Sequence, residues 1–146
     1  MMIRVQAEDF DPGAELARFR QTTTDVGAVA TFLGLVRGDG GLIAMTLDHY
    51  PGMTERQLEA IEAEARRRWP LADSLVIHRH GRLLPGDNIV FVATASTHRQ
   101  AAFEACEFLM DWLKTKAPFW KFEERAQGGA WVEAKSTDDA AAARWE

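Results

Sequence analysis

The feature that most constrains the fold of this chain is a long stretch of helical periodicity near its carboxyl end. Between residues 97 and 116 the polar side chains recur at alternating spacings of four and three, at Gln100, Glu104, Glu107, Asp111 and Lys114. This spacing places them on one stripe of an α-helix and leaves a broad apolar surface around the rest. No glycine or proline interrupts the stretch before Pro118, which ends it. We therefore expect one continuous helix, either central in the fold or at a subunit interface.

The rest of the chain alternates short strands with shorter helices. Strands are expected at residues 2–6, 27–37, 42–50, 74–81 and 88–96, and near 131–135. Helices are expected from Pro12 to Arg20 behind an Asp11 cap, over 54–69 behind a Thr54/Gln57 capping box, and after Ser136. Segments 27–37 and 42–50 flank a Gly-rich loop, which favours a hairpin. This order predicts one α+β domain over residues 1–146 with a largely antiparallel sheet.

Composition argues against several classes of protein. The 146 residues are 47% hydrophobic and 27% charged, with a net charge of −5, which is typical of a globular chain. Nucleic-acid binding is not expected, because it needs a basic face. No apolar run reaches the roughly 18 residues of a membrane span, and the first residues lack a signal-peptide pattern. With a single cysteine, which agrees with a reducing compartment, we expect a cytoplasmic protein without membrane contact.

Against this acidic background, three lysines surround an apolar segment in LKTKAPFWKFEE. They are Lys114, Lys116 and Lys121, on either side of Pro118. Lysines at a helix end complement the macrodipole, and Lys114 has Asp111 one turn earlier as a partner for an ordinary intrahelical ion pair. Partial burial among like charges, in contrast, makes a lysine amine available for proton transfer. The segment is therefore either a solvated helix end or an anion-binding reaction centre.

Two further candidates for anion binding involve arginine. His98 and Arg99 open the long helix, where free backbone N–H groups and the helix dipole favour an anion. The turn is either an oxyanion or phosphate site or an ordinary capping turn with solvated side chains. Arg37 is the last residue of a nearly uncharged strand. Its guanidinium either binds a phosphate through two parallel hydrogen bonds or is simply solvated at the strand end.

Other chemistries receive less support from the residues. His49, His78 and His80 fall at strand ends without a pattern of metal-ligand spacing, so no metal site is expected. Cys106 lies in the middle of the long helix on its apolar surface, where a thiol behaves as a small hydrophobic group and not as a nucleophile.

Six segments, in this order, resemble the MoaE family of large, catalytic subunits of molybdopterin synthase: GAVATFLGLVR, LDHYPGMTE, RRRWPL, HRHGRLLPGD, STHRQAAFEACEF and DWLKTKAPFWKFE. The resemblance covers about Gly27 to Trp145. It implies an α/β hammerhead fold with an added antiparallel β subdomain. It also implies sulfur transfer to cyclic pyranopterin monophosphate from the thiocarboxylated C-terminus of a small ubiquitin-like subunit, which forms the dithiolene of molybdopterin. No cofactor is implied.

The resemblance also implies roles for individual residues. Lys114 matches the essential lysine, as proton donor or as stabiliser of a tetrahedral intermediate, and Lys121 matches a second lysine that binds substrate and supports catalysis. The implied substrate-binding residues are Arg37, His98, Arg99, Lys114, Lys121, Glu123 and Lys135. This chain departs from the family pattern at Phe122, where a second basic residue is frequent, and at Lys135, where arginine is frequent. A lysine at 135 weakens any bidentate phosphate contact there.

Two other functions remain open on the residues alone. A noncatalytic adaptor would dock a ubiquitin-like Gly-Gly tail without chemistry. A hydrolase of cyclic phosphates would need a water-activating base or a metal cluster, for which the sequence offers no pattern.

The length of the long helix separates two of the candidate groups. His98 and Lys114 are 16 positions apart, or about 24 Å at 1.5 Å per residue, and a pyranopterin is too small to touch both. We therefore expect a homodimer, at the centre of a heterotetramer with two small subunits. In each of its two composite sites, Lys114 and Lys121 of one chain would meet His98 and Arg99 of the other.

Overall fold

The first of two sheets forms the centre of the molecule. A computed structural model describes residues 2–20, 24–133 and 136–146, and in it the first sheet has the strand order β1-β4-β6-β2. Its strands are β1 (Met2–Gln6), β2 (Ala28–Leu35), β4 (Leu71–Arg79) and β6 (Asn88–Ser96). β1 and β4 pair in parallel, whereas β4–β6 and β2–β6 are antiparallel. The expectation of a largely antiparallel α+β fold is confirmed.

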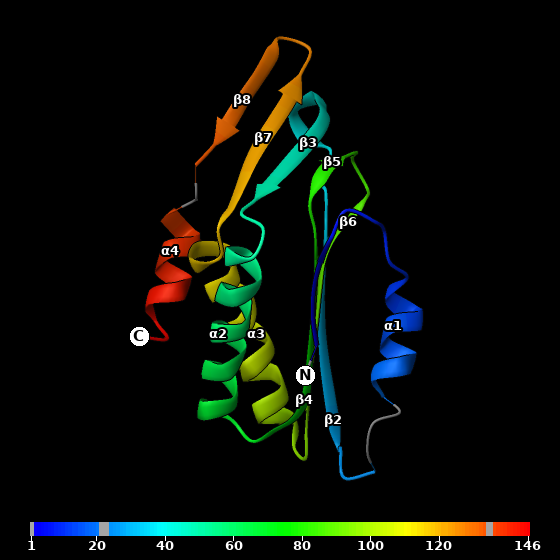
Figure 1. The fold of residues 1–146 in the computed structure, drawn as a ribbon, viewed down its shortest axis with the longest axis vertical. Coiled ribbons are helices and arrows are strands. Elements are labelled where there is room, and N and C mark those ends of the chain that lie inside the picture. Colours follow the sequence, from blue (N-terminus) through cyan, green and yellow to red (C-terminus); the bar gives the residue numbers. More distant parts are fainter. Residues whose placement is uncertain (1, 21–23, 134–135) are drawn as a thin grey trace.

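Helices cover both faces of this sheet (Figure 1). The helices are α1 (Pro12–Phe19), α2 (Met53–Arg68), α3 (Arg99–Lys116) and α4 (Ser136–Ala143). α1 lies on one face, where Phe19 packs with Ile77 and Phe91. α2 and α3 lie on the opposite face, where Phe108 and Leu109 belong to the same core as Val76. Successive side chains of β4 therefore enter two separate cores, as the two-residue period of a strand requires.

A second sheet extends beyond the end of the first (Figure 1). It has the order β5-β3-β7-β8, and all its pairs are antiparallel. Its strands are β3 (Leu42–His49), β5 (Gly81–Leu83), β7 (Phe119–Arg125) and β8 (Gly128–Val132). A smaller apolar cluster beneath it includes Met45, Leu47 and Leu83. This sheet is the antiparallel β subdomain that the family resemblance implied.

The predicted hairpin of residues 27–37 and 42–50 is wrong. β2 pairs with β6 in the first sheet, whereas β3 pairs with β5 and β7 in the second. The Gly-rich loop, which includes a short 3-10 turn η1 (Asp39–Gly41), carries the chain from one sheet to the other. Tertiary packing determined which strands pair, because a strand with an apolar face pairs where that face is best buried.

The long helix is continuous, as predicted. α3 runs from Arg99 to Lys116, with His98 as its extended N-cap, so it begins two residues later than expected. Phe108 and Leu109 are fully buried, but Phe103 on the same helix is 63% exposed. Within the described part of the chain, no helix is long and apolar enough to cross a membrane.

The two other predicted helix starts had different outcomes. Asp11 is the N-cap of α1 and accepts a hydrogen bond from the Ala14 amide at 3.2 Å, as predicted. The Thr54/Gln57 box is wrong, because Gly52 caps α2 and its amide donates to Glu55 at 3.0 Å. Gly52 has a φ of +84°, a conformation that glycine adopts readily and that allows the helix to begin one residue earlier.

Candidate active site at the junction of the two sheets

Lys114 lies in the last turn of α3 and has no partner in the structure. Its side chain is exposed and makes no hydrogen bond or ion pair with any described residue. The predicted alternative, an ion pair with Asp111, does not form. The Asp111 carboxylate instead accepts from Arg144 at 3.0 Å and from the Trp145 indole at 2.7 Å. Lys114 therefore keeps its charge available for an anion.

Lys116, two residues further along, has a different environment. Its ammonium lies 3.4 Å from a carboxylate oxygen of Glu146 and 4.7 Å from the ring centroid of Trp112. Lys116 is exposed and makes these two contacts at the surface. It is a natural comparison for Lys114, because both lysines lie in the same helical turn.

Lys121 reaches the same junction from strand β7. It lies opposite Leu47 of β3 and Val132 of β8, and it is half-buried. Glu123 is two residues further along β7 and therefore shares the face of Lys121. The Glu123 carboxylate pairs with Arg125 at 3.2 Å, and Arg125 also donates to the Gly40 carbonyl at 2.6 Å. These contacts connect β7, the strand that carries Lys121, to the loop between the two sheets.

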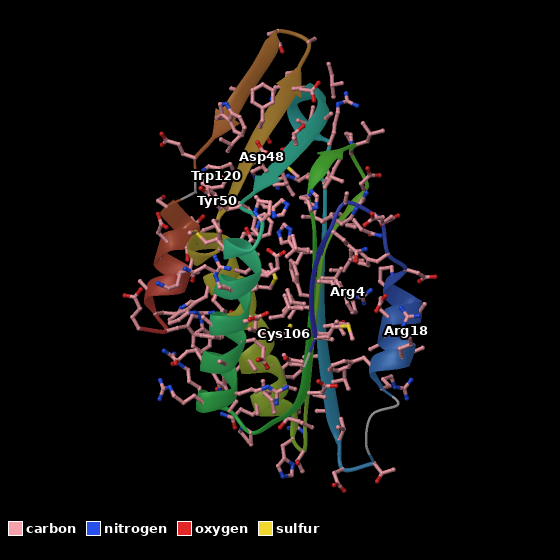
Figure 2. All side chains as sticks on the ribbon, in the orientation of Figure 1. Arg4, Arg18, Asp48, Tyr50, Cys106 and Trp120 are labelled. Atoms are coloured by element: carbon pink, nitrogen blue, oxygen red, sulfur yellow. The ribbon has the colours of Figure 1, made fainter. Side chains whose placement is uncertain are left out.

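Aromatic rings fill the space where the first sheet meets the second. His78 stacks on Phe119 with ring centroids 3.8 Å apart, and the His49 and His80 rings pack at a tilt with centroids 4.1 Å apart. Tyr50 and Trp120, both exposed, have centroids 6.4 Å apart at the same junction (Figure 2). Of these rings His78 is buried, His49, His80 and Phe119 are half-buried, and Tyr50 and Trp120 form an exposed rim.

Two histidines at this junction, His78 and His80, have lowered pKa values. Burial lowers the pKa of His78 to about 4, helped by the charge of Lys114 and by the neighbouring His49 and His80, while a hydrogen bond to the Arg79 carbonyl opposes the shift. Burial and His49 also lower the pKa of His80, against the acidic residues Glu8, Glu55 and Asp48. At neutral pH these rings therefore add no positive charge beside the lysines.

His98 and Arg99 lie at the opposite end of α3. Both side chains are exposed, and neither forms a hydrogen bond or ion pair within the described ranges. A pocket of about 250 Å³ adjoins His98 and is lined by Trp69, Pro70, Ser96, Thr97, His98, Gln100, Ala101 and Glu104. Because α3 is unbroken, about 24 Å of helix separates this end from Lys114. One chain does not bring the two groups together.

Arg37 and Lys135 complete the predicted set of site residues. Arg37 follows β2, is exposed, and pairs with Asp39 at 3.2 Å. Lys135 lies outside the described residues. The structure therefore joins Lys114, Lys121 and Glu123 around one short connection, and leaves Arg37 on the loop between the sheets.

Cys106 and metal binding offer no competing chemistry here. Cys106 is buried between α3 and the first sheet (Figure 2), and burial together with Glu107 raises its pKa to about 11. A thiol in this state is a poor nucleophile. In the described ranges, no group of three or more His, Cys, Asp or Glu side chains is arranged to hold a metal ion.

Two features of this site were not predicted from the sequence. Strand β7 was not predicted, although Trp120 and Phe122 alternate there with Lys121 and Glu123, which is a strand signal. His78 was considered for metal binding alone. His78 is two residues from Val76, so both side chains lie on the face of β4 that α2 and α3 cover. This spacing could have predicted from the sequence that His78 is buried.

The fold and the site define an α+β protein in which two lysines flank the short connection between a helix and a strand, at the junction of two sheets. A family model described as MoaE protein matches residues 5–116, and the chain belongs to this family. It is 57% identical to the molybdopterin synthase catalytic subunit of Mesorhizobium japonicum, covering 99% of this chain and 92% of the relative. The corresponding subunit of Cereibacter sphaeroides is also 57% identical, covering 99% and 100%.

A solved structure agrees with this membership. The molybdopterin biosynthesis MoaE protein from Burkholderia ambifaria superimposes on this chain with a TM-score of 0.86 at 57% identity, covering 99% of this chain and 97% of that one. The fold that the family resemblance implied is confirmed.

Proposed function

We propose that this chain is the catalytic subunit of a molybdopterin synthase and acts as a sulfurtransferase. The observation that carries the proposal is the unpaired Lys114 ammonium, joined by a short connection to the strand of Lys121. The relatives at 57% identity are named as catalytic subunits of this enzyme. Such a name indicates a second subunit, for which we propose the small, ubiquitin-like sulfur carrier.

The proposed reaction moves sulfur from the carrier's C-terminal thiocarboxylate to cyclic pyranopterin monophosphate. In each delivery the sulfur forms a bond to a side-chain carbon of the pterin, which gives up an oxygen substituent, and water cleaves the acyl carbon–sulfur bond, so that the carrier's terminal glycine ends as a carboxylate. Negative charge develops on the acyl oxygen when water adds to the acyl carbon and a tetrahedral intermediate forms. A positioned ammonium stabilises such charge, and most strongly where bound substrate excludes water. We assign this role, or proton donation, to Lys114, and substrate binding to Lys121 and Glu123.

The proposal includes a homodimer with composite sites. Phosphate and pterin contacts are assigned to His98 and Arg99 of a second chain, because one continuous helix holds them about 24 Å from Lys114. The exposed Phe103 on α3, together with Phe32 and Leu35 on the edge strand β2, supplies apolar surface for such contact. Arg37 and Lys135 are further proposed substrate contacts.

The proposed location is the cytoplasm, where a single buried thiol is compatible with reducing conditions.

Reconstitution tests the function directly. The protein is mixed with a thiocarboxylated small subunit and cyclic pyranopterin monophosphate, and molybdopterin is measured by mass spectrometry. The same subunit with an ordinary C-terminal carboxylate is the control. We expect molybdopterin with the thiocarboxylated subunit and none with the carboxylate control. If the tail binds but an intact thiocarboxylate gives no product, the chain is an adaptor and the enzymatic proposal fails.

A further inference from the structure

The C-terminal residues of the chain lie against α3, the helix that carries Lys114 (Figure 1). α4 packs beside this helix, and the Trp112 indole donates a hydrogen bond to the Ala142 carbonyl at 3.2 Å. Beyond α4, the Trp145 ring packs edge-on against Phe108, with ring centroids 5.8 Å apart. These contacts hold the end of the chain at a defined place on α3.

Arg144 and Trp145 bind the same carboxylate of that helix. The Arg144 guanidinium donates to Oδ2 of Asp111 at 3.0 Å, and the Trp145 indole donates to the same oxygen at 2.7 Å. Arg144 also pairs with Glu107, one turn earlier on α3. The Asp111 side chain is only 18% exposed. Two donors from one segment therefore satisfy a carboxylate that is largely shielded from water.

Asp111 precedes Lys114 by three residues, a spacing at which oppositely charged side chains of a helix pair. Among the described residues, however, Arg144 is the one cation paired with Asp111. Lys114 is exposed and forms no hydrogen bond or ion pair within the described ranges. Lys116, in the same turn, is paired with Glu146. The end of the chain thus pairs with the other charged groups around Lys114 and leaves its ammonium available.

We propose that Arg144 is a positioning residue for the reaction at Lys114 and acts through Asp111. By compensating this carboxylate, it prevents an Asp111–Lys114 ion pair that would hold the ammonium against the helix and neutralise its charge. The Trp145 indole assists by engaging the same carboxylate oxygen. The inference rests on the proposed function, since it assigns Lys114 a reaction to serve. It differs from a purely structural role of the C-terminal segment, for which the negative charge of Asp111 would be irrelevant.

A charge-reversion experiment tests this role in the reconstituted enzyme. Arg144→Ala removes the compensating cation, and kcat should fall about threefold to tenfold. An exposed pair at this spacing is weak, but shielding of the carboxylate from water strengthens its attraction for Lys114. Asp111→Asn alone removes the negative charge and should leave kcat within about twofold of the wild type. The double variant Asp111→Asn/Arg144→Ala should recover most of the lost kcat, because no carboxylate remains to pair with Lys114.

Two further variants serve as controls. Arg144→Lys keeps a cation at this position and should retain most of the activity. Glu146→Gln breaks the ion pair with Lys116 in the same segment without touching Asp111, and its kcat should equal that of the wild type.

A second measurement does not require turnover. The rate at which an amine-reactive reagent labels Lys114 is measured by peptide mass spectrometry, with Lys116 as internal reference. An ammonium paired with Asp111 reacts more slowly, so labelling of Lys114 should fall about twofold to fivefold in Arg144→Ala and return in the double variant. Constant labelling of Lys116 shows that the end of the chain is still in place. If Arg144→Ala releases it, Arg144→Gln replaces that variant, because glutamine keeps a donor for Asp111 without the charge.

The outcomes separate the two proposals. A kcat of the uncharged Arg144 variant equal to that of the wild type overturns the positioning role. A loss of kcat that Asp111→Asn does not restore also overturns it, since the damage would then be to the packing of α3. Unchanged labelling of Lys114 has the same meaning. A wild-type protein that makes no molybdopterin counts against the proposed function, and the labelling comparison still decides whether Arg144 controls Lys114.

Discussion

Asp111 accepts a hydrogen bond from Arg144 at 3.0 Å, although Lys114 stands one turn further along the same helix. The C-terminal residues thereby occupy the carboxylate that would otherwise neutralise Lys114. Trp145 adds a second donor to Asp111 and packs edge-on against Trp69 and Phe108. The segment after α4 therefore has a consequence for the active site without contacting it, because it leaves the Lys114 ammonium unpaired.

Replacement of Lys114 by alanine should separate activity from stability. We expect kcat to fall by roughly 10² to 10⁴, the range for loss of a positioned acid or charge stabiliser. The free energy of unfolding should change by less than about 0.5 kcal/mol, because the side chain is exposed and unpaired. Lys116→Ala is the control, and steady-state kinetics and urea unfolding are the measurements. Equal activity of the two variants would remove Lys114 from the mechanism.

Mixed dimers should recover activity if the sites are shared. Lys114→Ala and the double variant His98→Ala/Arg99→Ala are each expected to be inactive. A dimer with one chain of each type would contain one intact composite site and one doubly defective site. After subunit exchange, molybdopterin formation should return to a fraction of the wild-type rate. Mixed dimers verified by mass spectrometry but without activity would show that each chain builds its own site.

The buried His78 should make stability depend on pH in a definite direction. Its pKa is lowered from 6.5 to about 4 in the folded protein, so between these values the unfolded chain binds a proton that the folded one does not. Stability from this group is therefore fully present above pH 6.5 and is lost as the pH falls toward 4, by at most about 3 kcal/mol.

Urea unfolding of wild type and His78→Phe from pH 7 to pH 4 measures this effect. The stability advantage of the wild type over the variant should shrink as the pH falls. The other titratable groups are present in both proteins, so their contributions largely cancel in the difference. A difference between the two proteins that does not vary with pH would contradict the buried, neutral state of His78.

Cys106 should be chemically silent in the folded protein. Burial raises its pKa to about 11, and the thiolate is the reactive form. A thiol reagent at pH 8 should therefore modify Cys106 only after denaturant is added. Cys106→Ala should retain turnover, with a modest loss of stability from the small cavity. Rapid modification of the native protein, accompanied by loss of activity, would assign the thiol a role that its position argues against.

Local sequence determined the elements whose signals lie within a few residues. The polar stripe of α3, its uninterrupted length, the Asp11 cap of α1 and the burial of Cys106 all follow from side-chain periodicity and capping chemistry. The same periodicity showed that His98 and Lys114 cannot meet within one chain. These properties require no knowledge of what the helix packs against.

Tertiary structure alone decided the pairing of the strands and the partners of the charged groups. β2 and β3 are neighbours in sequence but belong to different sheets, because their apolar faces are buried in different cores. The Asp111 carboxylate pairs with Arg144, 33 residues away, and not with Lys114. The His78 ring stacks on Phe119, 41 residues further along the chain. Periodicity reports which face of an element is buried. It carries no information about which distant element covers that face, and this choice stacked the buried His78 imidazole on Phe119.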